Sequence, residues 1–158
     1  LAAPFLAGLP ALAELGKRRD ITVSIYHRAV IWGFVAERID ERPILGWGMH
    51  ASRNVPGGRD QIMAFTEKIP LHPHNAPLQI RLELGLIGAL LAAALAAAVA
   101  FGCGGSLSRR MVLMATFATA LFVASVSYGI WQGWWYSTLW LVGGFAVVVG
   151  RQQGTGGA

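Results

Sequence analysis

Hydrophobic residues are distributed unevenly along the 158-residue chain, which has an apolar start, a polar middle and a largely apolar second half. Three long apolar segments occupy the second half, at 76–101, 110–128 and 134–150. A transmembrane helix needs about 17–25 mostly apolar residues, so each segment predicts one span. The pattern therefore predicts an all-α, polytopic transmembrane helix bundle with a mostly helical extracytoplasmic loop.

The apolar start, 1–16, is too short to cross a membrane by itself. We interpret it as the end of a truncated transmembrane helix, with an interfacial helix as the alternative. The chain has no initiator Met, and its first residues lack the basic region and cleavage pattern of a signal peptide. These features predict that the chain is a fragment of a longer protein. The upstream transmembrane helices of that full-length protein are then expected partners of the helices in this chain.

The polar middle, 17–75, is predicted to be a loop that contains one helix at about 24–42. Ser24 can cap the start of this helix. Pro43 disfavours helical geometry in the residue before it and so predicts the end. Apolar side chains recur between these limits with a spacing near 3.6 residues, which predicts one buried face. The residues of that face are Ile25, Trp32, Val35 and Ile39.

Glycine-rich turns follow the predicted helix. Gly46 and Gly48 flank Trp47, and glycine readily adopts the positive φ that a tight turn requires. A second turn is predicted at 56–60. The next segment, 61–69, is either a short helix or a plain loop.

Two groups of side chains distinguish the predicted spans. The first span carries a stripe of small residues suited to close helix packing, namely Gly85, Ala89, Ala92 and Ala96. The connection into the third span is rich in aromatic residues, as expected for a belt at the membrane interface. These residues are Trp131, Trp134, Trp135 and Tyr136.

Charge is sparse and segregated. Charged residues make up 13% of the chain, against about 25% in a typical soluble domain. All eight acidic residues and ten of the thirteen Lys and Arg residues precede Leu84. The net charge of +5 is spread along the loop without a nucleic-acid recognition motif, so no nucleic-acid partner is predicted. A basic loop beside a membrane instead suits lipid head groups or a diphosphate.

The short connections predict the orientation. Arg109 and Arg110 lie between the first two spans, and Arg151 follows the third. Alternating crossings place all three on one side, which the positive-inside rule makes cytoplasmic. The tail 151–158 is then cytoplasmic, and the loop 17–75 faces the periplasm. That loop is itself basic, but the rule weakens for loops approaching about 60 residues.

The loop meets the first span at His72-Pro73-His74-Asn75. Asn75 is a favourable N-cap, and Pro77 is tolerated in a first helical turn. A helix that begins here directs its free N–H groups and the positive end of its dipole toward two imidazoles. This arrangement favours a phosphate or another anion. The alternative is a capped helix with two incidental histidines.

Metal chemistry has little support in the sequence. The single cysteine, Cys103, excludes an internal disulfide and a cysteine-based metal site, and we expect it near a helix end. His72 and His74 have no Cys, Asp or Glu close by in sequence to complete a metal site. We predict no metal and no cofactor. Structural roles are expected for His27 and His72, whereas the role of His50 stays open.

Glu83 lies about two turns inside the first predicted span. A buried carboxylate needs a partner or a proton. We expect structural pairing with Arg28, with Arg81 or with a residue on an upstream helix.

Three motifs, taken in order, suggest a family. Arg28-Ala29-Val30-Ile31-Trp32 fits an Arg-x-x-x-Trp motif at the start of a loop helix. Arg42-Pro43-Ile44-Leu45-Gly46-Trp47-Gly48 fits a Pro-hydrophobic-hydrophobic-Gly-x-Gly turn, and His74-Asn75 precedes Gly85 by nine residues. Over roughly 1–150 the chain resembles the C-terminal part of the O-antigen ligase/polymerase family of bacterial membrane glycosyltransferases. The ligase pattern has a β-branched or small residue where this chain has Leu86.

The resemblance implies transfer of a glycan from an undecaprenyl-diphosphate carrier, during surface polysaccharide biosynthesis in the bacterial inner membrane. The acceptor is lipid A-core in the ligases and a second carrier-linked glycan in the polymerases. The resemblance also implies Arg28 and His74 as the catalytic residues. Arginine suits the departing diphosphate, and histidine suits a base or, when protonated, a phosphate ligand. The candidate substrate-binding residues are His72, Asn75, Gln79 and Arg81.

Two functions from other classes are weaker alternatives. A membrane transporter subunit would need charges along a path, and the predicted spans offer only Arg81 and Glu83, both near one end. A scaffold protein without chemistry would leave Arg28, His74 and Asn75 without a purpose.

Overall fold

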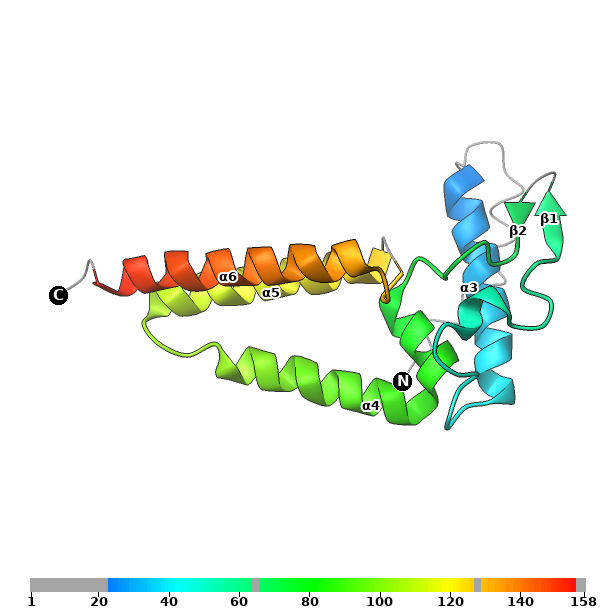
Figure 1. Ribbon diagram of the computed structural model, residues 1–158, viewed down its shortest axis with the longest axis horizontal. Coiled ribbons are helices and arrows are strands. Elements are labelled where there is room, and N and C mark those ends of the chain that lie inside the picture. Colours follow the sequence, from blue (N-terminus) through cyan, green and yellow to red (C-terminus); the bar gives the residue numbers. More distant parts are fainter. Residues whose placement is uncertain (1–22, 64–65, 127–128, 156–158) are drawn as a thin grey trace.

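The computed structural model describes residues 23–63, 66–126 and 129–155, so the predicted helix end at 1–16 lies outside the described residues. Figure 1 shows α3 and a small hairpin at one end of the molecule, and α4, α5 and α6 extending away from them. The elements are α3 (Val23–Glu41), a 3-10 turn η1 (Ala51–Arg53), β1 (Gln61–Met63), β2 (Thr66–Glu67), α4 (Ala76–Gly102), α5 (Leu107–Val126) and α6 (Gly133–Thr155).

The predicted all-α, polytopic fold is confirmed. Within the described ranges, three helices are long and apolar enough to cross a membrane: Ala76–Gly102, Leu107–Val126 and Gly133–Gln152. α5 and α6 pack along one another, whereas α4 diverges from them (Figure 1). Most of their large apolar side chains are exposed, and α5 buries none of its residues. These surfaces therefore suit lipid or further helices rather than water.

The ends of α5 and α6 differ from the prediction. α5 begins at Leu107, so Arg109 and Arg110 lie in its first turn rather than in a loop. The Ser106 hydroxyl accepts a hydrogen bond from the Arg109 N–H at 3.4 Å, which satisfies one free donor at the helix start. α6 continues to Thr155, so Arg151 is helical rather than part of a polar tail. Arg and Gln are good helix formers, and polarity alone does not end a helix.

α3 is the main helix of a small domain, which consists of α3, η1, the hairpin and the residues of α4 before Gly85. It was predicted at about 24–42 and spans Val23–Glu41, so Ser24 lies inside the helix and is not its N-cap. One apolar cluster joins α3 to the start of α4 through the loop between them. Its buried members are Ile31, Phe34, Val35, Ile39, Val55, Ile69, Leu78 and Leu82. Burying their apolar surface is what attaches the loop to the long helices.

The segment 61–69 forms neither of the predicted structures. β1 and β2 pair antiparallel, with Gln61 opposite Glu67 and Met63 opposite Thr66. Lys68 closes the base of this hairpin, because its backbone N–H donates to the Asp60 carbonyl oxygen at 2.9 Å and its ammonium pairs with the Asp60 carboxylate at 3.1 Å. Such pairing depends on contacts between two segments, and two or three residues are too few to show a period of two.

α4 is broken at Gly85, a kink that the predicted span at 76–101 did not include. Gly85 has φ 64° and ψ −156°, so the regular helical hydrogen bonds across it are lost. The turn after α3 replaces these bonds. The Trp47 and Gly48 N–H groups donate to the Leu82 and Glu83 carbonyl oxygens at 2.9 and 2.8 Å.

The same turn also supplies acceptors on the far side of the break. Its Pro43 and Ile44 carbonyl oxygens accept from the Leu86 and Ile87 N–H groups at 2.9 and 3.3 Å. The backbone groups freed by the kink are thus paired within the protein, as membrane surroundings require.

Two glycines allow the turn after α3 to lie directly against the backbone of α4. A Cβ on Gly46, which has φ 71°, would lie 2.6 Å from the Glu83 carbonyl and from the Gly85 nitrogen. A Cβ on Gly85 would overlap the Ile44 carbonyl oxygen. Gly85 therefore allows close contact between α4 and the backbone of the turn after α3. It does not act as part of the predicted helix-packing stripe. The residues of α4 before it belong to the small domain, and those after it run along the direction of α5 and α6 (Figure 1).

Candidate functional site at the start of α4

The N-terminal half of α3 contacts the segment that leads into α4. The Trp32 indole N–H donates to the Pro73 carbonyl oxygen at 2.9 Å. Arg28 lies four residues earlier, and side chains four residues apart are neighbours on one helix face. Its guanidinium donates to the carbonyl oxygen of Val126, the last residue of α5, where carbonyls lack partners within the helix. One face of α3 therefore meets both the His72–His74 turn and the end of α5.

The connection between α5 and α6 meets the same turn. A Cβ added to Gly129 would lie 2.7 Å from the His72 imidazole, so the glycine backbone rests directly on that ring. The His72 and His74 rings meet edge to face, with centroids 4.3 Å apart. Arg28 and His74, the predicted catalytic pair, therefore lie on segments that adjoin one another.

His74 has an unusual backbone. Its φ of 55° lies in the left-handed region, which non-glycine residues seldom occupy. Its N–H donates to Nδ1 of His72 at 3.2 Å, and this bond holds the turn. The strained conformation is maintained by its surroundings, as is common at functional sites.

His72 is neutral at physiological pH. Burial, with smaller effects of nearby His74 and Arg53, lowers the pKa of His72 from 6.5 to about 4. Since Nδ1 accepts from His74, the proton of the neutral ring is on Nε2. That N–H faces the Gln132 amide at 3.5 Å. The pairing requires the amide oxygen of Gln132 to face His72, and this oxygen otherwise has no partner among the described residues.

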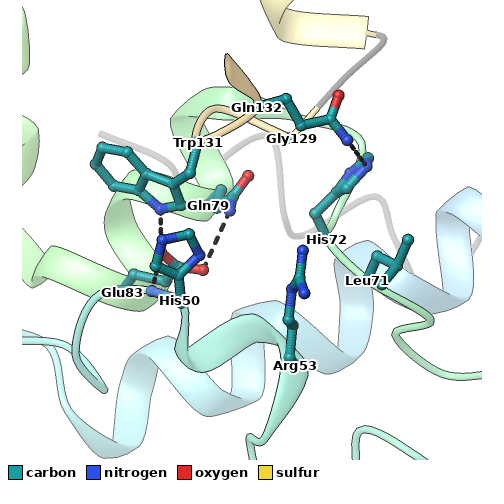
Figure 2. Close-up of a pocket in the computed structure, with 9 residues that line it drawn as sticks. All are labelled: His50, Arg53, Leu71, His72, Gln79, Glu83, Gly129, Trp131 and Gln132. Carbon is teal, nitrogen blue, oxygen red and sulfur yellow. Dashed lines mark hydrogen bonds between the residues drawn. The ribbon is translucent and has the colours of Figure 1, made fainter. Parts of the chain in front are cut away.

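Glu83 is the centre of a hydrogen-bond cluster (Figure 2). Its side chain is completely buried and accepts from five donors on three segments. Oε1 accepts from the Ser52 N–H at 3.2 Å, from the Ser52 hydroxyl and from Gln79 Nε2 at 3.1 Å. Oε2 accepts from the His50 N–H at 2.9 Å and from the Trp131 indole. These five donors connect η1, α4 and the turn before α6.

The predicted pairing of Glu83 with an arginine is wrong. Among the described residues, every hydrogen-bond partner of its carboxylate is a neutral group and none is an arginine. Arg28 instead contacts Val126, and Arg81 donates to the Pro43 carbonyl oxygen at 3.1 Å.

The four predicted substrate-binding residues are all engaged within the protein. Asn75 is the N-cap of α4, because its Oδ1 accepts from the Leu78 N–H at 2.9 Å. Gln79 donates to Glu83 and accepts from the Ile130 N–H at 2.9 Å, so its amide bridges α4 to the turn before α6. His72 supports the turn described above, and Arg81 holds the Pro43 turn.

The remaining histidines have structural positions. His27 Nε2 lies 2.9 Å from the Glu67 carbonyl oxygen. His50 has φ 61° at the start of η1, and its ring centroid lies 6.1 Å from that of Trp131. Cys103 is the C-cap of α4, near a helix end as predicted. In the part of the chain that the structure describes, no three His, Cys, Asp or Glu side chains are grouped to hold a metal.

The sequence did not reveal the roles of Trp131 and Ser52. Trp131 was predicted to belong to an interfacial aromatic belt, yet its indole binds Glu83. Ser52 is buried and binds the same carboxylate twice. Neither residue lies in a motif, and the three segments meet only in the folded chain. The one available signal was Glu83 itself, since a buried carboxylate requires donors.

A small cavity adjoins the cluster and the His72 imidazole (Figure 2). Its volume is about 30 Å³, which is room for one or two water molecules. His50, Arg53, Gln132 and Trp131 lie around it. The cavity itself is too small for a sugar, so a glycan can contact only the groups at its mouth.

Comparison with known proteins identifies the family. The family model described as "O-Antigen ligase" matches residues 8–93, more than half of the chain. The chain belongs to the O-antigen ligase family. Family membership and the three apolar helices indicate a multi-pass membrane protein of a family of glycan-transfer enzymes.

The curated relatives carry compatible names. Proteins named as candidate polysaccharide ligases from Rickettsia conorii and Rickettsia felis are 37% and 34% identical to the chain over 126 and 147 residues. The alignments cover 75% and 84% of this chain but 31% and 36% of those proteins, so the chain spans about a third of their length. No solved structure matches.

Proposed function

We propose that the protein transfers a glycan from an undecaprenyl-diphosphate carrier to an acceptor such as lipid A-core. The reaction takes place at the periplasmic face of the bacterial inner membrane and needs no metal. Polymerisation onto a second carrier-linked glycan is the alternative reaction of the same site. Membership of the O-antigen ligase family supports glycan transfer in general.

The observation that carries this proposal is the meeting of α3 with the His72–His74 turn. The Trp32 hydrogen bond to Pro73 fixes this contact, and Arg28 lies one helical turn from Trp32. The segments that carry the Arg28 guanidinium and the His74 imidazole therefore adjoin near the N-terminal end of α4. The positive dipole of that helix end adds to the attraction for phosphate oxygens.

These groups match what the chemistry requires. The acceptor hydroxyl oxygen forms a bond to the anomeric carbon of the donor glycan. The bond from that carbon to the diphosphate oxygen breaks, and its electron pair leaves with the diphosphate. His74 takes the hydroxyl proton, and Arg28 stabilises the departing anion through paired hydrogen bonds. Neutral His72 keeps the His74 turn in place, and Asn75, Gln79 and Arg81 hold the surrounding backbone.

The orientation follows from the two ends of the long helices. The Arg109 side chain meets the backbone of Gly150, so the start of α5 and the end of α6 lie together. Arg110 and Arg151 belong to this end, which the positive-inside rule makes cytoplasmic. Arg28 contacts the opposite end of α5 and therefore lies on the periplasmic side of our arrangement.

Complementation tests the proposal. A strain lacking the gene is supplied with the full-length protein carrying Arg28→Ala or His74→Ala, and its lipopolysaccharide is separated on a gel. We expect each variant to accumulate in the membrane and to lose glycan attachment, because a general base contributes about 10²–10⁴-fold to the rate. Arg110→Ala is the matched control, since Arg110 is exposed at the opposite end of α5.

The gel also separates the two reactions. Glycan missing from lipid A-core indicates ligation, and a single repeat unit on the core indicates polymerisation. Glycan of normal amount and length in both the Arg28 and the His74 variants would refute the assignment of these residues to catalysis.

A further inference from the structure

The side chain of Arg53 lines the small cavity and has no partner among the residues that the structure describes. Its backbone is firmly placed, because the preceding residue, Ser52, binds Glu83 through both its N–H and its hydroxyl. The Arg53 N–H donates to the His50 carbonyl oxygen at 3.3 Å. Figure 2 shows the Arg53 side chain rising from η1 between His50 and His72. No ion pair or side-chain hydrogen bond joins this guanidinium to another residue that the structure describes.

The surroundings of Arg53 favour an anion at the cavity mouth. The positive charge of Arg53 is close enough to His72 to contribute to its lowered pKa. His72 therefore stays neutral and does not compete as a cation. The carboxylate of Glu83, the acid that lines the same cavity, is already saturated by five donors and forms no ion pair with Arg53. The guanidinium charge is thus left for a ligand.

The cavity adjoins the site proposed for glycan transfer. His72 lines the cavity, and its ring contacts that of His74. We propose that Arg53 is a substrate-binding residue that takes a phosphate group of one of the two substrates. Planar guanidinium binds phosphate oxygens in pairs, which a lysine cannot reproduce. This inference rests on the proposed function, and it adds a second cation that acts on binding rather than on the chemical step.

Two sources could supply the phosphate, namely the diphosphate of the donor and the phosphates of a lipid acceptor. The test uses the full-length protein in lipid nanodiscs with an undecaprenyl-diphosphate-linked glycan and phosphorylated lipid A-core. Transfer is measured while each substrate is varied in turn. Arg53 is exposed, so Arg53→Ala and Arg53→Lys remove no buried contact. Arg110→Ala again controls for the loss of one positive charge.

For Arg53→Ala we expect the KM of one substrate to rise about tenfold, because charged hydrogen bonds to phosphate are lost. The kcat should stay within about twofold, since no interaction specific to the transition state is removed. Arg53→Lys should fall between Ala and the unmodified protein. A raised donor KM assigns the diphosphate, and a raised acceptor KM assigns the acceptor phosphate.

Unchanged KM values for both substrates in Arg53→Ala would overturn the inference. Arg28→Ala and His74→Ala are measured in the same assay to separate the two proposals. If these two variants lose turnover while Arg53→Ala binds normally, only the Arg53 assignment fails. If they keep normal turnover, the proposed function fails first.

Discussion

The hydrogen-bond cluster around Glu83 makes a sharp prediction about stability. Glu83→Gln preserves shape and replaces one acceptor oxygen with an NH₂ donor. If the amide oxygen takes the place of Oε1, it keeps the three donors from Ser52 and Gln79. The amide NH₂ then faces the His50 N–H and the Trp131 indole N–H, which are donors themselves.

The size of the effect follows from these two donors, which lose their shared acceptor. A buried donor without a partner costs ~1–3 kcal/mol, so Glu83→Gln should lower the free energy of unfolding by about 2–6 kcal/mol. If the amide oxygen instead takes the place of Oε2, the Ser52 and Gln79 donors are left unpaired. This placement therefore does not reduce the loss of stability.

The assay compares Glu83→Gln with Glu37→Gln, the same change on the exposed surface of α3. The thermal unfolding midpoint in detergent and the amount of protein in the membrane are measured for both. We expect the Glu83 variant to unfold at a clearly lower temperature and to accumulate poorly. Equal midpoints for the two variants would refute the five-donor description of Glu83.

Two further predictions concern the kink and the histidine turn. Gly85→Ala should reduce stability by about 3 kcal/mol or more, because positive φ strains alanine and its Cβ overlaps the Ile44 carbonyl. Gly33→Ala is the control, because a Cβ on Gly33 would meet open space. Equal thermal unfolding midpoints of the two variants in detergent would exclude this explanation of the kink. The pKa of His72 is depressed from 6.5 to about 4. The stability it contributes is present above pH 6.5 and falls as pH drops toward 4, because the unfolded chain binds the proton first. His72→Asn keeps an acceptor for the His74 N–H, and melting across this window should show a weaker pH dependence than in the unmodified protein.

The long apolar segments determined the membrane helices from sequence alone. The three spans and the helix before Pro43 are each specified by local hydrophobic periodicity and composition, which require no knowledge of distant residues. The N-cap at Asn75 was predictable for the same reason, since capping involves residues within one turn. The paired strands β1 and β2 were not predicted, because such short strands are defined by pairing rather than by periodicity.

The tertiary structure decided which hydrogen-bond partners the backbone groups at the kink and the buried Glu83 side chain receive. The kink at Gly85 exists because the turn around Gly46 supplies hydrogen bonds to both sides of it. The buried Glu83 carboxylate is satisfied because donors arrive from η1 and from the turn before α6, far away in sequence. Local sequence fixes which groups need partners, since buried polar groups must be paired. Only the packing of distant segments fixes which partners they receive, and with them the placement of Arg28 and His74 on adjoining segments.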